Sequence, residues 1–139
     1  DANYAGFIKE TDERLAGWEA RMARLKGLKI ITYHSSWPYF AKRFGLEIAG
    51  HVEPKPGIPP SAAHLNDLVK KMKSENIGVI LTETYYPRKG PDFLAGKTGA
   101  RVVTAPVSAG GVDGVKTYFD VFDRVLGGLE FAVSSQGHK

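Results

Sequence analysis

The sequence predicts an α/β fold: a four-stranded parallel sheet with helices on both faces, preceded by a long amino-terminal helix. Three observations carry this prediction. Four short apolar segments rich in β-branched residues are each followed by a segment with helical periodicity. Strands that alternate with helices in this way pair in parallel and are covered on both faces. The chain has 139 residues, of which 42% are hydrophobic and 24% charged, as is usual for one globular domain.

The first predicted element is a helix over residues 2–26, because apolar residues recur there at alternating spacings of four and three. These residues are Tyr4, Ile8, Thr11, Leu15, Trp18, Met22 and Leu25. We expect the helix to pack across the sheet through Leu15, Trp18 and Met22 and to end at Gly27. A coiled-coil segment is the alternative, although the stripe spans only about three heptads and contains a threonine.

After Gly27 the chain alternates between predicted strands and helices. The strands are expected at 28–33, 47–52, 79–82 and 101–105, and the helices at 36–44, 61–75, 91–98 and 115–133. Ser61 follows two prolines and suits the amino-terminal cap of its helix. Right-handed crossovers would bring the carboxyl ends of all four strands to one edge of the sheet.

Composition excludes several classes of function. The chain has no cysteine, which excludes disulfides, thiol catalysis and cysteine-based metal sites and fits an extracytoplasmic protein. Its net charge is +4, yet the lysines at 70, 71 and 73 lie on the polar side of one predicted helix, so we expect no nucleic-acid partner. No apolar run is long enough to span a membrane. No signal peptide is evident, and the sequence begins inside a predicted helix, which indicates a mature chain or a fragment.

Polar residues follow the predicted strands at the edge where parallel strands end. In chain order they are His34 with Ser35, His51 to Glu53, Glu83, and Ser108. An imidazole and a carboxylate from different strands, here His34 and Glu83, can bind one zinc or manganese ion. Two ligands leave the coordination sphere incomplete, so water or another domain must complete it. Glu83 could instead orient His34 as a hydrogen-bond partner, and His34 could simply be bonded within its loop.

Other polar residues are given structural interpretations. His51 is assigned to the sheet, His64 to the first turn of a helix, and His138 to the tail without a role. Asp120 and Asp123 are interpreted as one polar helix face. The glycine-rich loop 108–114 lacks the pattern of a phosphate-binding loop. The proline-rich loop 53–60 is expected to be a rigid wall or docking edge.

Three stretches together resemble the zinc and manganese solute-binding proteins of ABC importers, and specifically their carboxy-terminal lobe. They are Thr-Tyr-His-Ser-Ser-Trp-Pro-Tyr-Phe at 32–40, Phe-Gly-Leu at 44–46, and Glu-Pro-Lys-Pro-Gly-Ile-Pro-Pro-Ser at 53–61. Thr-Glu-Thr-Tyr-Tyr at 82–86 is similar to the family's segment after the third strand of this lobe. Residues 1–27 are similar to the end of the long helix that links the two lobes, and residues 28–139 to the metal-binding lobe itself.

The resemblance implies a metal site and a cellular role. His34 matches the metal ligand from the first strand of this lobe, and Glu83 matches an acidic position that is a ligand or supports one. Manganese-type members have an aspartate where this chain has Ser108, which favours zinc and leaves manganese as the alternative. The amino-terminal lobe, with two further histidines, would be missing. The implied partner is a membrane ABC permease, and the implied location is periplasmic or extracytoplasmic, associated with the cell surface.

The leading interpretation is therefore a binding module that captures zinc, not an enzyme. The alternative is a small flavodoxin-like hydrolytic enzyme that uses His34 as general base with Glu83 as its orienting group. A third interpretation is a metal-free interaction domain descended from the binding proteins. Zinc titration separates them, since only the first requires zinc binding that depends on His34.

Overall fold

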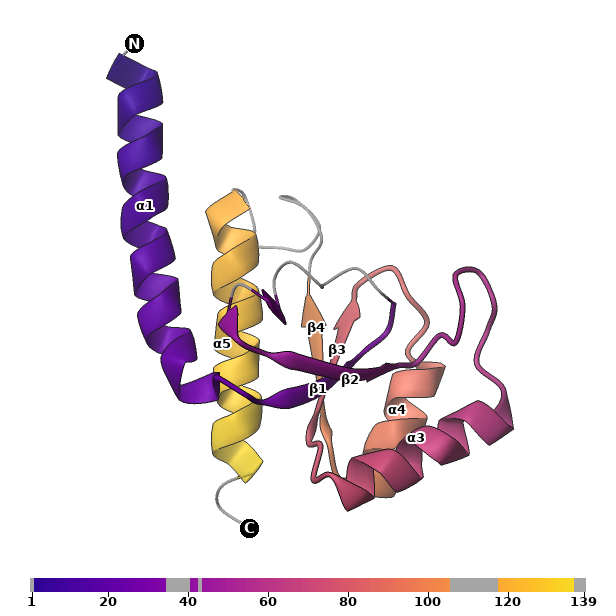
Figure 1. Ribbon diagram of the computed structural model, residues 1–139. Coiled ribbons are helices and arrows are strands. Elements are labelled where there is room, and N and C mark those ends of the chain that lie inside the picture. The colour runs from indigo at the N-terminus through magenta and orange to yellow at the C-terminus, as the bar shows by residue number, and fades with distance from the viewer. Residues whose placement is uncertain (1, 35–40, 43, 106–117, 137–139) are drawn as a thin grey trace.

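The structure is a computed structural model that describes residues 2–34, 41–42, 44–105 and 118–136 (Figure 1). Its elements are, in chain order, α1 (Ala2–Met22), η1 (Ala23–Leu25), β1 (Lys29–Thr32), β2 (Glu47–His51), α3 (Ala62–Ser74), β3 (Val79–Glu83), α4 (Lys89–Thr98), β4 (Arg101–Ala105) and α5 (Tyr118–Gln136). The four strands match the predicted strands to within one residue at each end.

The strands form one parallel sheet in the order β2-β1-β3-β4, which confirms the predicted fold class. The inner strands, β1 and β3, are buried almost throughout, as strands covered on both faces should be. The pairing of β1 with β2 shifts register between Ile30 and Ile31. Because β1 lies between β2 and β3, residues that follow those two strands flank the end of β1.

Two apolar clusters lie on opposite faces of this sheet. Successive residues of a strand point to opposite faces, so Ile30 and Leu81 enter one cluster while Ile31 and Ile80 enter the other. The first cluster is covered by α5 and the second by α3 and α4, which Figure 1 shows on the two sides of the sheet. Helices thus cover both faces, as predicted.

The helix ends follow the local sequence signals. The Ser61 hydroxyl accepts a hydrogen bond from the His64 backbone N–H at 3.1 Å, which confirms the predicted cap of α3. Helix α4 begins at Lys89, two residues before the predicted start, because Pro91 is tolerated in a first helical turn. Helix α5 covers Tyr118–Gln136, where the prediction was 115–133, and residues 115–117 lie outside the described residues. Of the predicted helix at 36–44, the structure describes 41, 42 and 44, which are helical.

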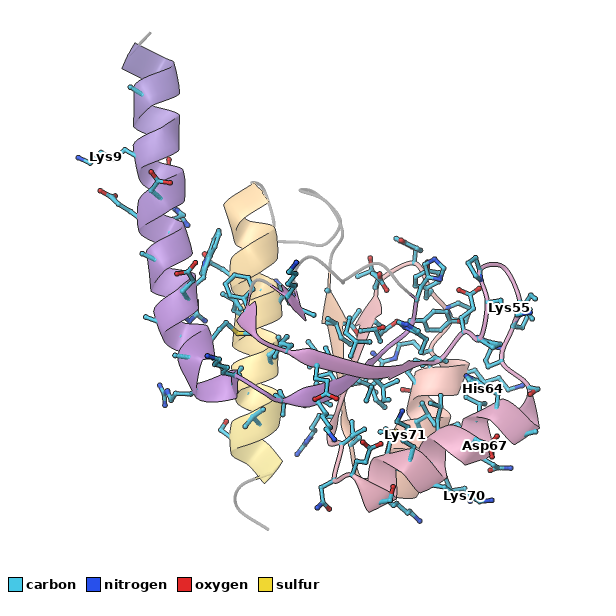
Figure 2. All side chains as sticks on the ribbon, viewed as in Figure 1. Lys9, Lys55, His64, Asp67, Lys70 and Lys71 are labelled. Carbon is cyan, nitrogen blue, oxygen red and sulfur yellow. The ribbon has the colours of Figure 1, made fainter. Side chains whose placement is uncertain are left out.

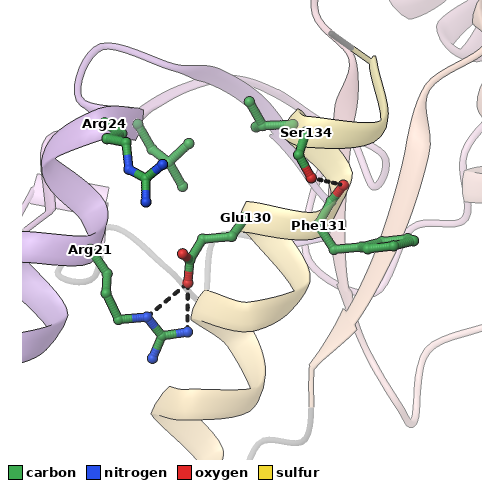
Figure 3. Close-up of a pocket in the computed structure, with 7 residues that line it drawn as sticks. Arg21, Arg24, Glu130, Phe131 and Ser134 are labelled. Atoms are coloured by element: carbon green, nitrogen blue, oxygen red, sulfur yellow. Dashed lines mark hydrogen bonds and ion pairs between the residues drawn. The ribbon is translucent and has the colours of Figure 1, made fainter. Parts of the chain in front are cut away.

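Helix α1 confirms the predicted amino-terminal helix, but it packs beside α5 rather than directly across the strands (Figure 1). Trp18 and Met22 are buried in the α5-side cluster, while the Leu15 side chain lies outside the described residues. The physical reason is that α5 already covers this face of the sheet. Arg21 joins the two helices by a hydrogen bond from its Nε to Glu130 Oε1 at 2.8 Å (Figure 3).

The basic residues of α3 are on its exposed side, as predicted from the sequence. Lys70 and Lys71 are exposed beside the exposed Asp67 on the same helix (Figure 2). Lys71 also approaches Glu75 one turn further along, at 4.0 Å. This surface therefore mixes both signs of charge.

Candidate metal-binding site

His34 lies just past the carboxyl end of β1, where the sequence placed it. The backbone N–H of the preceding Tyr33 donates to the carbonyl of Leu81 in β3 at 3.0 Å, which ties the segment after β1 to the sheet. The Thr32 hydroxyl donates to the His34 carbonyl at 3.0 Å. The His34 side chain is 24% exposed, so its ring is partly open to solvent at the edge of the sheet.

The carboxylate that contacts His34 is Glu53, at the end of the neighbouring strand β2. His34 Nδ1 lies 2.8 Å from Glu53 Oε2. The backbone N–H of Glu53 donates to the Tyr33 carbonyl at 3.0 Å, so the parallel pairing continues past β2 and brings these side chains together. From the sequence, Glu53 was expected at this edge of the sheet but was not paired with His34. The sequence had suggested Glu83 as the carboxylate that orients His34, whereas the carboxylate in contact with His34 Nδ1 is that of Glu53.

Glu83 is the last residue of β3, on the other side of β1, and it is only 1% exposed. Its carbonyl accepts a hydrogen bond from the Tyr86 backbone N–H at 3.2 Å. Burial is the main cause that raises the pKa of Tyr86 to about 12. A hydrogen bond with Tyr85 and the nearby charges of Tyr85, Glu83 and Glu53 also contribute to this increase. Glu83 is therefore a buried acidic group next to Tyr86, and its role as a metal ligand remains a prediction.

Aromatic side chains form one wall beside these groups. The rings of Tyr33 and Tyr86 stack with their centroids 4.3 Å apart, and the Tyr86 ring lies 6.1 Å from that of His34. Burial, followed by the charge of Glu53, raises the pKa of Tyr33. The raised pKa values keep both phenols neutral well above neutral pH, and the Tyr86 ring lies beside His34.

His51 and His64 are hydrogen-bonded into the fold, which agrees with their structural interpretation. Since the Thr32 hydroxyl donates its proton to the His34 carbonyl, its oxygen must accept from His51 Nδ1, 2.8 Å away. His64 Nε2 donates to the His51 carbonyl at 2.8 Å and so links α3 to β2. Burial, and then the proximity of His34, lower the pKa of His51.

This lowered pKa predicts that His51 makes the fold less stable in acid. The unfolded chain, with a histidine pKa of about 6.5, binds a proton to His51 more readily than the folded chain, so stability falls as the pH drops below that value. Asparagine at 51 can place its Nδ2 donor near Thr32 but cannot titrate. We expect His51→Asn to lose less unfolding free energy than the wild type between about pH 7.5 and about pH 5.5, measured by urea unfolding. Equal losses in both proteins would contradict the assignment.

Several predicted features lie outside the described residues, among them Ser108 and the loop 108–114. Within residues 2–34, 41–42, 44–105 and 118–136, no group of three or more histidine, aspartate and glutamate side chains is placed to hold a metal ion. In the same ranges, no helix is both long and apolar enough to cross a membrane.

Comparison with protein families matches almost the whole chain to one family. The sequence model of the family described as "Zinc-uptake complex component A periplasmic" matches residues 1–131. The high-affinity zinc uptake system protein ZnuA of Brucella suis biovar 1 (strain 1330) is 27% identical over 135 residues, which are 96% of this chain and 40% of that protein. The ZnuA protein of Bacillus subtilis (strain 168) is 36% identical over 98 residues, 70% of this chain and 30% of that protein. The chain therefore spans less than half the length of these relatives.

Solved structures show the same fold. A crystal structure of ZnuA has a TM-score of 0.77 and 26% identity, and the match covers 94% of this chain and 47% of that one. The laminin-binding protein Lmb of Streptococcus agalactiae, described as bifunctional with adhesin and metal transporting activity, has a TM-score of 0.76 and 25% identity. That match covers 93% of this chain and 50% of Lmb. The resemblance found in the sequence is confirmed, and the half-length coverage agrees with a single lobe.

Proposed function

The chain belongs to the periplasmic zinc-uptake component A family, and from this premise we propose that it is the carboxy-terminal lobe of a zinc-binding solute-binding protein. In this proposal the lobe helps to capture zinc outside the cytoplasm and to deliver it to an ABC permease in the membrane. Residues 1–27 form the end of the helix between lobes, and residues 28–139 form the metal-binding lobe. No bond is made or broken.

The observation that supports this function most directly is the placement of His34. Its ring lies at the carboxyl edge of a parallel sheet, where ligand sites of such sheets occur. Nδ1 is engaged by Glu53 at 2.8 Å, which leaves the other ring nitrogen, Nε2, for a metal. Imidazole nitrogen is a preferred ligand of zinc. The similarity to proteins named for zinc uptake supports zinc, rather than manganese, as the bound metal.

We propose Glu83 as a second metal ligand. It ends the strand next to β1 and is almost completely buried near Tyr86. Carboxylate oxygen is a common zinc ligand in proteins, and Glu83 would supply it from the strand beside the one that ends at His34. The remaining ligands would come from the second lobe, since this chain spans 40% of the Brucella suis relative.

Membership of the zinc-uptake component family also argues against the alternative of a hydrolytic enzyme. The family is one of uptake components, not of enzymes. A general-base role for His34 with Glu83 as its orienting group would need Glu83 on Nδ1, where Glu53 lies. We therefore propose that the chain has no enzymatic activity of its own.

We expect this chain to bind zinc with one-to-one stoichiometry but weakly. Loss of a single supporting partner typically lowers metal affinity by about 10–100-fold, and a lobe without its counterpart lacks whole ligands. Titration of the 139-residue chain with zinc by calorimetry measures this, with magnesium as the control ion because magnesium prefers oxygen ligands. Nanomolar zinc binding by a monomer would contradict a shared site, and an absence of zinc binding even at millimolar concentrations would favour the metal-free interaction domain.

A further inference from the structure

We propose that Glu53 is a positioning residue that holds His34 in one tautomer and that the turn after β2 exists to hold Glu53. The part of this inference that concerns zinc rests on the proposed function. The part that concerns the tautomer of His34 stands on the contacts of the metal-free protein.

The first step concerns the proton on the His34 ring. A neutral imidazole has one N–H and one bare nitrogen, and an ionised carboxylate can only accept hydrogen bonds. The 2.8 Å contact between His34 Nδ1 and Glu53 Oε2 therefore places the proton on Nδ1. Both side chains are largely shielded from solvent, with 24% and 11% exposed, so water competes poorly for this contact. Nε2 is left as the only nitrogen with a lone pair.

The second step concerns what holds Glu53. Its other carboxylate oxygen, Oε1, accepts a hydrogen bond from the Gly57 backbone N–H at 2.8 Å. Its backbone N–H is fixed on the Tyr33 carbonyl. The carboxylate is thus bound on both oxygens and anchored through its own backbone, so its orientation is set without a metal ion.

The third step concerns the turn that presents the Gly57 N–H. The backbone N–H of Ile58 donates to the Lys55 carbonyl at 3.0 Å and closes the turn. Gly57 has φ of +79°, a conformation that residues with a side chain rarely adopt. Pro54 and Pro56 each fix one dihedral angle and restrain the residue before them. The rigid loop predicted from the prolines thus acquires a specific role, to aim one carboxylate at His34.

Glu53 and Glu83 therefore have different roles despite lying on either side of β1. Each oxygen of Glu53 already accepts a hydrogen bond from the protein, one from His34 and one from Gly57. This arrangement suits a group that orients a ligand and raises its basicity. The site is pre-organised on the His34 side by this chain alone.

The test is nitrogen-15 NMR of the histidine rings in the full 139-residue chain without metal, at a pH where histidine is neutral, with His34→Gln to assign the His34 signals. We expect the wild type to show His34 protonated at Nδ1. Glu53→Ala should release the ring to exchange between both tautomers and lower zinc affinity by about 10–100-fold. Glu53→Gln keeps an acceptor oxygen but not the charge, so it should retain most of the tautomer preference and lose less affinity.

Glu75→Gln is the matched control, because Glu75 makes a comparable 2.9 Å contact with Lys29 at the opposite edge of the sheet. It should change neither the His34 signals nor zinc affinity. An unchanged Nδ1 tautomer in Glu53→Ala, with native circular dichroism, overturns the inference. If the tautomer changes in Glu53→Ala but neither this variant nor His34→Gln alters zinc binding, the positioning role stands and the proposed metal site is wrong.

Discussion

Replacing His34 by alanine is expected to abolish the zinc binding that this chain retains. His34 is the imidazole ligand of the proposed site, so its loss should exceed the about 10–100-fold effect of losing a supporting residue. Protons compete with zinc for an imidazole nitrogen, so binding by the wild type should weaken as the solution is made more acidic. Calorimetric titration of the wild type and of His34→Ala at about pH 7.5, with the wild type repeated at about pH 5.5, provides the measurement.

The controls for this experiment are His51 and His64, and a variant of Glu83 tests the proposed second ligand. His51→Asn and His64→Ala should keep zinc binding, since both rings are hydrogen-bonded within the fold. Glu83→Gln should lower zinc affinity but leave the His34 tautomer unchanged, because Glu53 holds Nδ1. Far-ultraviolet circular dichroism should be native in His34→Ala, because His34 is a partly exposed residue at the carboxyl ends of the strands, and it checks the fold of the other variants. Loss of binding in His51→Asn or His64→Ala, with retention in His34→Ala, would show that the site is assigned to the wrong histidine.

The sheet could be predicted from sequence because its strands carry strong local signals. The segment 79–82, for example, is mostly apolar, contains β-branched residues and lies between a helix and a turn, and both faces of β3 are indeed buried. The position of α1 was harder to predict. The apolar stripe predicts that one face of α1 is buried, but it does not predict whether strands or another helix cover that face. The strand order and the place of α5 decide that question.

The sequence alone also could not identify which carboxylate contacts His34. Because β1 is flanked by both β2 and β3, Glu53 and Glu83 reach the same edge of the sheet from opposite sides of His34. The residue pattern alone ranks them equally. A signal for Glu53 was nevertheless present in the loop, since Gly57 follows at a spacing that lets its N–H reach back to a carboxylate four residues earlier. In this turn, the Gly57 N–H binds the Glu53 carboxylate and so fixes the orientation of that side chain.

The interface between α1 and α5 also contains residues whose roles the sequence left undetermined. Asp123, interpreted as part of a polar face, accepts a hydrogen bond from Trp18 Nε1 at 2.5 Å and lies 3.4 Å from Arg14 Nη1. Its partners are more than one hundred residues away in sequence, so no local pattern could identify them. With the Arg21–Glu130 contact (Figure 3), this interface ties the proposed inter-lobe helix to the lobe.

Trp18→Ala is accordingly expected to destabilise the fold by about 3–5 kcal/mol, the usual cost of truncating a buried aromatic side chain. Trp18 is only 6% exposed and packs in the cluster between α1, α5 and the sheet. Trp18→Phe keeps most of the packing and removes the hydrogen bond to Asp123, so it should lower the free energy of unfolding by about 1 kcal/mol. Urea unfolding followed by far-ultraviolet circular dichroism measures both effects, independently of tryptophan fluorescence.

Phe131→Ala is the matched control, because this aromatic residue lies on α5 but is 68% exposed. Its free energy of unfolding should stay within about 0.5 kcal/mol of the wild type, as for most surface substitutions. If Trp18→Ala were as mild as Phe131→Ala, α1 would not unfold together with the sheet. The helix would then be an independent segment attached to the lobe. A cost close to that of a core residue would instead mean that α1 and the sheet unfold as one cooperative unit.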